Sequence, residues 1–253
     1  MKVTFLGTGT STGVPVIACN CPVCISHNPR DKRFRSSIMI EMEGSNFIID
    51  CGPDFRFQML KHRVDNIDAI LFTHEHRDHI AGLDDIRAFN YILNKTIDIY
   101  GTEDVIAAIK TEFPYIFTET RFFSAPQIKI HKIDSDTLEI NGVKIIVIHA
   151  MHNKMPVIGF RINDFSYITD ANYISPEEMK KLENSKIIVI NALRNSKHVS
   201  HFSLGEAIEI IKELKPDTAY ITHISHFLGL HDEVNARLPE NIRLAHDNLV
   251  IQV

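Results

Sequence analysis

Apolar residues fall along this chain in short runs that are separated by turn-forming and charged residues. Runs rich in valine, isoleucine, tyrosine and phenylalanine predict β-strands, and these strands form two batches. The first batch covers residues 2–7, 36–42, 46–51, 68–73 and 96–101. The second batch covers residues 127–133, 143–150, 156–162, 165–170, 186–191 and 218–223, and residues 249–253 close the chain.

Helices are predicted between many of these strands. They cover residues 53–62, 78–92, 102–112, 175–183, 203–214 and 230–238. Ser203 followed by Glu206 is a capping-box pattern, which is typical of a helix start. Strands that alternate with helices in this way predict sheets covered by helices, an α/β sandwich. Because no linker-like or low-complexity segment interrupts the pattern, we interpret residues 1–253 as one domain.

The composition narrows the classes of partner. The chain has 253 residues, of which 44% are apolar and 23% charged, as expected of a globular protein with a substantial core. Its net charge of −5 argues against a broad basic surface for nucleic acid. The sequence has neither a run of about 18 apolar residues nor a secretory signal pattern, so we expect no membrane partner and a cytoplasmic protein.

The segment LFTHEHRDHIAGLDD, residues 71–85, crowds His74, His76, Asp78 and His79 directly after an apolar run. A strand that leads into a helix directs such side chains into one space. Imidazole and carboxylate groups bind zinc and also accept manganese or iron. An isolated histidine is more often a hydrogen-bonded surface or core residue, but the whole pattern at a strand end predicts metal ligands. Four ligands are too few for two metal ions, so further donors are expected elsewhere.

Candidate donors follow other predicted strands. They are His149 and His152 in VIHAMHN, Asp170 in YITDAN, and His223 and His226 in YITHISH. Alone, each has an ordinary structural explanation, such as an aspartate that caps a turn or a histidine hydrogen-bonded at the surface. Their common position at strand ends predicts instead that they share one metal centre.

Three of the four cysteines lie together, as Cys19, Cys21 and Cys24 in CNCPVC. They are too close in sequence for an ordinary secreted disulfide framework, and an intracellular cluster of this kind is more often a metal site. Thiolate-rich sites hold zinc for structure rather than for chemistry. The alternative is three reduced surface thiols. Cys51 has no evident partner and is interpreted as a small buried apolar group.

Together these motifs resemble the metallo-β-lactamase superfamily of hydrolases over nearly the whole chain. The resemblance implies a four-layer αββα sandwich with two catalytic divalent metals, zinc or manganese, at one edge between the sheets. The implied ligands are His74, His76 and His152 for one metal, and Asp78, His79 and His223 for the other, with Asp170 bridging both.

Two further assignments depend on the same resemblance. His152 is preferred to His149 as a ligand because HNKMPVIGF is similar to the family stretch that follows this ligand. Asp50, in FIIDCGPDFRFQ, matches a buried family aspartate that supports the metal ligands through hydrogen bonds.

The N-terminal motifs are more discriminating within the superfamily. FLGTGTSTGVPVIACNCPVC, RSSIMIE, DCGPDFR and HIAGLDDIR are similar to the branch of the cyclic ribose-phosphate phosphodiesterase (PhnP-like), and more distantly to ribonuclease Z. In that phosphodiesterase a cysteine run and a histidine hold one structural zinc. The residues in those places here are Cys19, Cys21, Cys24 and His226.

The resemblance implies hydrolysis of a small organic phosphodiester, such as a cyclic ribose or nucleoside phosphate, by metal-activated hydroxide. Asp78 would bind metal and orient that hydroxide. His201, in KHVSHFSLGEA, matches the family histidine that protonates the leaving oxygen. His198, three residues earlier, is the alternative acid, and a solvated loop histidine is the ordinary explanation of either residue.

Other functions stay open at this point. A ribonuclease Z-like nuclease is disfavoured by the acidic charge, a thioester hydrolase of the same fold by the cysteine cluster, and a non-enzymatic metal-binding protein by the full set of ligands. The expected partner is the small phosphodiester substrate. A homodimer is expected by family analogy alone. The natural substrate is not identified, because pocket walls set specificity.

Overall fold

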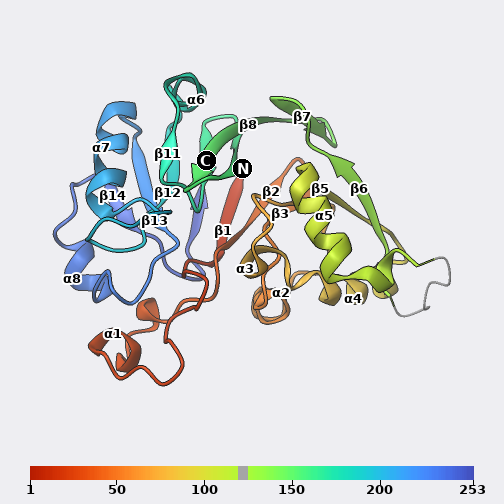
Figure 1. Cartoon of the computed structure of the whole chain (residues 1–253), viewed down its shortest axis with the longest axis horizontal. Coiled ribbons are helices and arrows are strands. Elements are labelled where there is room, and N and C mark those ends of the chain that lie inside the picture. The colour runs from red at the N-terminus through yellow and green to blue at the C-terminus, as the bar shows by residue number, and fades with distance from the viewer. Residues whose placement is uncertain (119–124) are drawn as a thin grey trace.

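The computed structural model describes residues 1–118 and 125–253. Within these residues the chain forms two β-sheets, and Figure 1 shows them between a group of helices on the left and another on the right. The chain termini lie side by side, since the Met1 amino group donates a hydrogen bond to the Val253 carbonyl at 3.0 Å.

The first sheet combines the N-terminal strands with the C-terminal one. Strands β3 to β6 run parallel to one another, whereas β1 is antiparallel to both of its neighbours. In spatial order the strands are β15 (Val250–Gln252), β1 (Lys2–Gly7), β2 (Ser37–Met42), β3 (Ser45–Ile49), β4 (Ala69–Leu71), β5 (Ile97–Gly101) and β6 (Ile128–Lys132).

The second sheet contains the central and C-terminal strands. Strands β10, β12, β13 and β14 are parallel, and β9 is antiparallel to both β8 and β10. In spatial order the strands are β11 (Tyr173–Ile174), β8 (Val143–His152), β9 (Met155–Ile162), β10 (Phe165–Ile168), β12 (Ile187–Asn191), β13 (Thr218–Thr222) and β14 (Ile242–Leu244), and β7 (Thr137–Ile140) pairs with β8.

Helices cover the outer face of each sheet. The first sheet carries α2 (Phe55–His62), α3 (Arg77–Ile80), α4 (Arg87–Leu93) and α5 (Glu103–Glu112). The second sheet carries α6 (Pro176–Leu182), α7 (Leu204–Leu214) and α8 (His231–Asn235), and the single-turn α1 (Pro22–Ile25) lies in an N-terminal loop. In the described ranges, none of the helices has the length and apolar character that a membrane crossing requires.

Three apolar cores separate the layers. In β2, for example, Ile38 and Ile40 belong to the core between the sheets, whereas Met39 belongs to the core under the helices. Because each such strand is buried on both faces, its sequence is a nearly continuous apolar run. The layer order is helix, sheet, sheet, helix, which confirms the predicted αββα sandwich.

The predicted helix over residues 78–92 is wrong as a single element. The structure has α3, then a 3₁₀ turn at Leu83–Ile86, and then α4. At the interruption, a Cβ on Gly82 would lie 2.0 Å from the carbonyl oxygen of Gly52, so the two backbones are in direct contact. The apolar spacing continues across the break because both parts face the same core.

The strand directions bring several loops to one edge. Strands β3 and β4 are parallel, as are β10, β12 and β13, and β8 has the direction of β10 because β9 is antiparallel to both. The carboxyl ends of parallel strands share an edge, which is where α/β proteins bind ligands. The predicted metal ligands follow these ends.

Candidate metal centre

Three of the residues at this edge have a left-handed backbone. The φ angles of Asp50, Asp170 and His223 are 65°, 54° and 54°. This conformation is uncommon outside glycine and costs about 1 kcal/mol per residue. Strain of this kind accumulates at functional sites, where the surrounding fold holds it in place.

The predicted ligands of the first metal lie together. The ring centroids of His74 and His76 are 4.7 Å apart, and those of His76 and His152 are 5.1 Å apart. His74 and His152 are buried and 5.8 Å apart, while His76 is exposed. His149 lies apart from them on the surface, where its Nε2 is 3.2 Å from Asp136.

The predicted ligands of the second metal also meet. One donor atom from each of Asp78, His79 and His223 lies within 4.8 Å of the others. The Nε2 atom of His79 is 3.2 Å from the Oδ2 atom of Asp78. The rings of His79 and His223 are stacked at 5.9 Å.

Asp170 lies between the two sets. Its Oδ2 atom is 3.2 Å from Nε2 of His79 and 3.0 Å from Nδ1 of His223. It also forms close donor groups with His74 on one side and with His152 on the other. This is the position that a bridging carboxylate requires, although a bridging role stays a prediction.

Asp50 supports two of the histidines. Its carboxylate accepts hydrogen bonds from Nδ1 of His79 at 2.7 Å and from the Thr73 hydroxyl at 2.9 Å. Since that hydroxyl donates to Asp50, it accepts from Nδ1 of His74 at 3.0 Å. Both rings therefore keep Nδ1 protonated and present Nε2 to the centre, as is common for metal-binding histidines.

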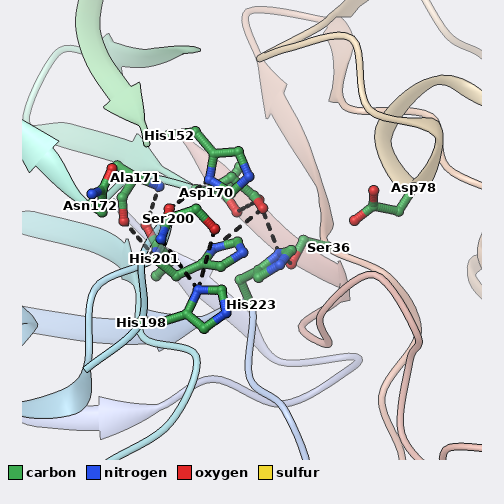
Figure 2. Close-up of polar contacts among 12 residues, drawn as sticks. Ser36, Asp78, His152, Asp170, Ala171, Asn172, His198, Ser200, His201 and His223 are labelled. Atoms are coloured by element: carbon green, nitrogen blue, oxygen red, sulfur yellow. Dashed lines mark hydrogen bonds and ion pairs between the residues drawn. The ribbon is translucent and has the colours of Figure 1, made fainter. Parts of the chain in front are cut away.

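Further supports were not predicted from the sequence. Nδ1 of His152 donates to the Ser200 carbonyl at 2.6 Å, and the Ser36 hydroxyl lies 3.2 Å from Nδ1 of His223 (Figure 2). A backbone carbonyl carries no sequence signal, because every residue has one. The serine at position 36 gives no local signal either, because its partner lies 187 residues away.

Burial controls the protonation of the cluster. It lowers the pKa of His74 well below its ordinary value, and it lowers the pKa of His152 as well. Burial alone would also lower the pKa of His79, but the carboxylates of Asp50, Asp78 and Asp170 raise it well above the ordinary range. His74 and His152 therefore present the neutral imidazole that binds metal.

The donor set fits divalent cations. Nε2 of His74, His79 and His223 is buried and makes no hydrogen bond within residues 1–118 and 125–253. For His79 this holds even though carboxylate oxygens of Asp78 and Asp170 lie 3.2 Å away. An unsatisfied buried group costs about 1–3 kcal/mol, which a bound cation would relieve. Imidazole with carboxylate suits zinc or manganese.

The two candidate acids lie beside this cluster. The His201 ring is 4.5 Å from that of His152 and 4.9 Å from that of His223, and its exposure is 9%. Burial and the nearby His223 lower the pKa of His201 to about 3. The His198 ring is half-buried and lies 5.2 Å from the His201 ring (Figure 2). Which of them is the acid stays a prediction.

A glycine positions Asp78. A Cβ on Gly52 would lie 2.0 Å from the carbonyl oxygen of Asp78, so any larger residue would displace one of the two segments. Gly52 follows Asp50 and Cys51, and the amide of Cys51 donates to the His79 carbonyl at 2.7 Å. The loop after β3 therefore fixes the backbone of the His-x-His-x-Asp-His segment.

The cysteine cluster meets His226 as predicted. The Sγ atoms of Cys19, Cys21 and Cys24 lie 3.4, 3.3 and 3.5 Å from Nδ1 of His226. Neighbouring sulfur and nitrogen ligands on a tetrahedral zinc ion are about 3.6 Å apart. A hydrogen bond from the Cys24 amide is the main cause that lowers the pKa of Cys21 to about 6, which favours a thiolate. This donor set fits a closed zinc site.

Known proteins share this architecture. A family model described as a beta-lactamase superfamily domain matches residues 45–224. The crystal structure of a diphosphatase from the PhnP family has a TM-score of 0.93 and 38% identity, and the match covers 100% of this chain and 97% of that one. Zinc-bound PqqB from Methylobacterium extorquens has a TM-score of 0.80 at 17% identity over the full length of both chains, which shows the fold alone.

Curated relatives are more varied. An octanoyltransferase from Porphyromonas gingivalis is 34% identical over 252 residues, which are 98% of this chain and 51% of that protein. A ribonuclease Z from a Nostoc species is 28% identical over 168 residues, which are 64% of this chain and 46% of the relative. The chain thus spans about half the length of these curated relatives.

Proposed function

Because this chain belongs to the β-lactamase superfamily and has the metallo-β-lactamase fold, we propose that it is a dinuclear metal-dependent phosphodiesterase. Its substrate is a small organic phosphodiester, such as a cyclic ribose or nucleoside phosphate. The observation that carries the proposal is the convergence of two sets of donors on the shared carboxylate of Asp170. The similarity to a PhnP-family diphosphatase supports chemistry at phosphorus.

His74, His76 and His152 would hold one cation, and Asp78, His79 and His223 would hold the other, with Asp170 shared. When bound, two such cations make a water molecule acidic enough to attack and neutralise charge on the phosphoryl oxygens. The carboxylate of Asp78 would also accept a hydrogen bond from the attacking water and so orient it. The cysteine cluster with His226 would hold a structural zinc.

The reaction forms one bond to phosphorus and breaks another. The water oxygen bonds to phosphorus, the ester oxygen leaves, and the leaving oxygen takes a proton so that an alcohol is released. His201 would give that proton, and the ring distances of 4.5 Å to His152 and 4.9 Å to His223 support this role. The proton that the water loses passes to solvent, and His201 takes one proton back from solvent, so the starting state is restored.

A second candidate is hydrolysis of a diphosphate, favoured by the relative that is described as a diphosphatase. Attack on phosphorus is the same in both reactions. The leaving group differs, since a phosphate departs with less need of a proton than an alcohol. The substrate specificity of this chain thus depends on the groups that surround the leaving oxygen.

The test is metal analysis of the purified protein combined with a substrate panel. The panel holds bis(p-nitrophenyl) phosphate, a ribose cyclic phosphate, a nucleoside 2′,3′-cyclic phosphate, a nucleoside diphosphate, a tRNA precursor and an octanoyl thioester. We expect about two catalytic equivalents of zinc or manganese, one further zinc, and turnover of the small phosphodiesters. Faster turnover of the thioester or of the tRNA precursor would reject the proposed function.

Asp78→Ala should abolish turnover in this panel, because it removes both a donor and the group that orients water. His201→Ala should lower kcat by about 100-fold or more, the usual effect of losing a general acid, while bound metal is largely retained. Glu43→Gln, in an exposed turn, is the matched control and should behave as the unaltered protein.

A further inference from the structure

The loop that carries both candidate acids connects β12 to α7, and it is held in one shape. Arg194 donates from Nε to the Ser196 carbonyl at 3.3 Å and from Nη2 to the Lys197 carbonyl at 2.8 Å. Asn172 donates from Nδ2 to the Val199 carbonyl at 3.1 Å. The loop is therefore fastened both internally and to the segment that follows Asp170.

Ser200 connects this loop to a predicted metal ligand. Its carbonyl accepts the hydrogen bond from His152, and both its amide nitrogen and its hydroxyl lie 3.3 Å from Nδ1 of His198 (Figure 2). A backbone amide can only donate, so Nδ1 of His198 is an acceptor. The ring proton of His198 is consequently on Nε2, on the side of the ring away from Ser200.

The same contact limits what His198 can do. A histidine that acts as an acid must first carry a proton on both nitrogens. The amide of Ser200 occupies the position where the second proton of His198 would lie. His198 is thus a fixed neutral donor.

The position of the ring indicates what receives this hydrogen bond. His198 is more exposed than His201, which is almost enclosed among His152, His223 and Asp170. Its ring lies 5.2 Å from that of His201, so His198 is a neighbour of the residue proposed to meet the leaving oxygen. A phosphoryl oxygen of a substrate bound at the metal centre is the acceptor that this position fits.

We propose that His198 binds substrate by donating its Nε2–H to a non-bridging phosphoryl oxygen, and that it is not the acid that protonates the leaving group. This inference rests on the proposed function and divides two roles that the sequence left undivided. It makes His198 a determinant of substrate affinity, and His201 a determinant of the rate with poor leaving groups.

Two phosphodiesters that differ only in their leaving group separate these roles. One releases p-nitrophenolate, and the other releases an alkyl alcohol. Loss of an acid harms the alkyl ester far more, because p-nitrophenolate leaves without a proton. Loss of a hydrogen bond to a charged oxygen harms both esters alike, by about tenfold or more in KM. The variants are His198→Ala, His198→Gln and His201→Ala, and each is assayed for metal content and melting temperature.

We expect His198→Ala to raise KM for both esters by about tenfold, with kcat changed less than about threefold. It should also raise the inhibition constant of inorganic phosphate. His198→Gln, which restores an N–H donor, should recover most of that affinity. His149→Gln, a surface histidine paired with Asp136, is the matched control and should change neither constant.

Two results would overturn the proposal. One is a His198→Ala defect that is much larger for the alkyl ester, because that makes His198 the acid. The other is a His198→Ala variant in which both KM and the inhibition constant of inorganic phosphate are unchanged. If the unaltered protein hydrolysed no phosphodiester, the proposed function would fail. In that case the affinity of the metal-loaded protein for inorganic phosphate tests the role of His198 separately. Equal affinity in the unaltered protein and in His198→Ala would reject the phosphoryl contact.

Discussion

The carboxylate of Asp50 receives hydrogen bonds from Thr73 and from His79, yet it belongs to neither predicted ligand set. It orients the imidazole of His79 directly and that of His74 through Thr73, so that the Nε2 atoms of both rings face the centre. A residue of this kind affects metal affinity without touching the metal. At the scale of single residues, the site therefore extends one layer beyond its donors.

Asp50→Asn should weaken binding of the catalytic metals by about 10–100-fold, because the amide is uncharged and supports His79 less strongly. Competition with a chelator of known affinity measures the effect. Asp98→Asn is a matched control, since Asp98 in β5 forms a partly exposed pair with His131 in β6, at 2.5 Å. Equal metal affinity in the two variants would contradict this role of Asp50.

His231 provides a prediction on acid stability. The ring is 4% exposed, its Nδ1 faces the guanidinium of Arg33 at 3.0 Å, and burial with the charge of Arg33 lowers its pKa to about 4. The ordinary value is about 6.5, so the unfolded chain binds the proton more tightly. The stability due to a neutral His231 is therefore complete above pH 6.5 and is lost as the pH falls towards 4.

His231→Asn keeps an acceptor for Arg33 and removes the titration. Between pH 7 and pH 5 we expect the unaltered protein to lose about 1 kcal/mol more than the variant, or about 2–4 °C in Tm. Asp247, whose pKa burial raises to about 6, acts in the opposite direction but is common to both proteins. Identical losses of Tm between the two pH values would show that His231 does not titrate in this window.

At the scale of elements, contacts between backbones determine where the catalytic motif lies. The loop after β3 meets α3 at Gly52, where a side chain would collide with the carbonyl of Asp78. The same loop meets the backbone of Gly82 and ends the first helical turn there. The position of this motif thus depends on the loop after β3 and on α3, which are in contact at Gly52 and Gly82.

Gly52→Ala should shift Asp78 and lower kcat by about 100-fold, the usual effect of a displacement near 1 Å. Gly205→Ala is the matched control, because a Cβ there meets nothing within 4 Å and the position lies in α7. The control should keep full activity and gain up to about 1 kcal/mol in stability, since alanine favours helix. Similar activity in the two variants would show that the Gly52 contact is not required.

The strands were largely predictable, and the reason is physical. Runs such as residues 186–191 and 218–223 are rich in apolar residues because both of their faces are buried, and the structure has β12 and β13 there. The short strands β7, β11 and β14 were missed, since they have few residues and depend on pairing with distant partners. The break in the helix predicted over residues 78–92 was missed, because the spacing of apolar residues carries no information on the contact between the backbones of Gly82 and Gly52.

The site was predictable where its residues form a contiguous motif or follow a strand. The cluster from His74 to His79 and the donors at positions 152, 170 and 223 come together as expected. The supports from Ser36 and from the carbonyl of Ser200 were not predictable, because they are formed only by tertiary contacts. Whether these donors bind metal stays a prediction for the experiments above.

For the whole molecule, the cysteine cluster joins distant parts of the chain. Cys19 and His226 are 207 residues apart, so a zinc ion held by them would fasten the N-terminal loop to the loop that follows His223. Metal that binds only the folded chain stabilises it. A zinc ion at this cluster would therefore affect the stability of the molecule more directly than its chemistry.

Cys21→Ser should remove about one equivalent of zinc and lower Tm by several degrees, at about 2–4 °C per kcal/mol, while kcat changes little. Atomic absorption and thermal unfolding measure the two effects. Cys51→Ala is the matched control, because Cys51 is buried in an apolar core and its loss should lower Tm without loss of zinc. Full zinc content in Cys21→Ser would exclude the cysteine site.

The left-handed backbone at Asp50, Asp170 and His223 also affects how this chain can diverge. Glycine would relax each of these positions, but glycine offers no donor to a cation. If these residues hold metal as proposed, metal binding would require three locally unfavourable choices. A descendant that no longer needed its ions would be expected to drift towards glycine or asparagine at these positions first, which would make them early markers of lost metal dependence.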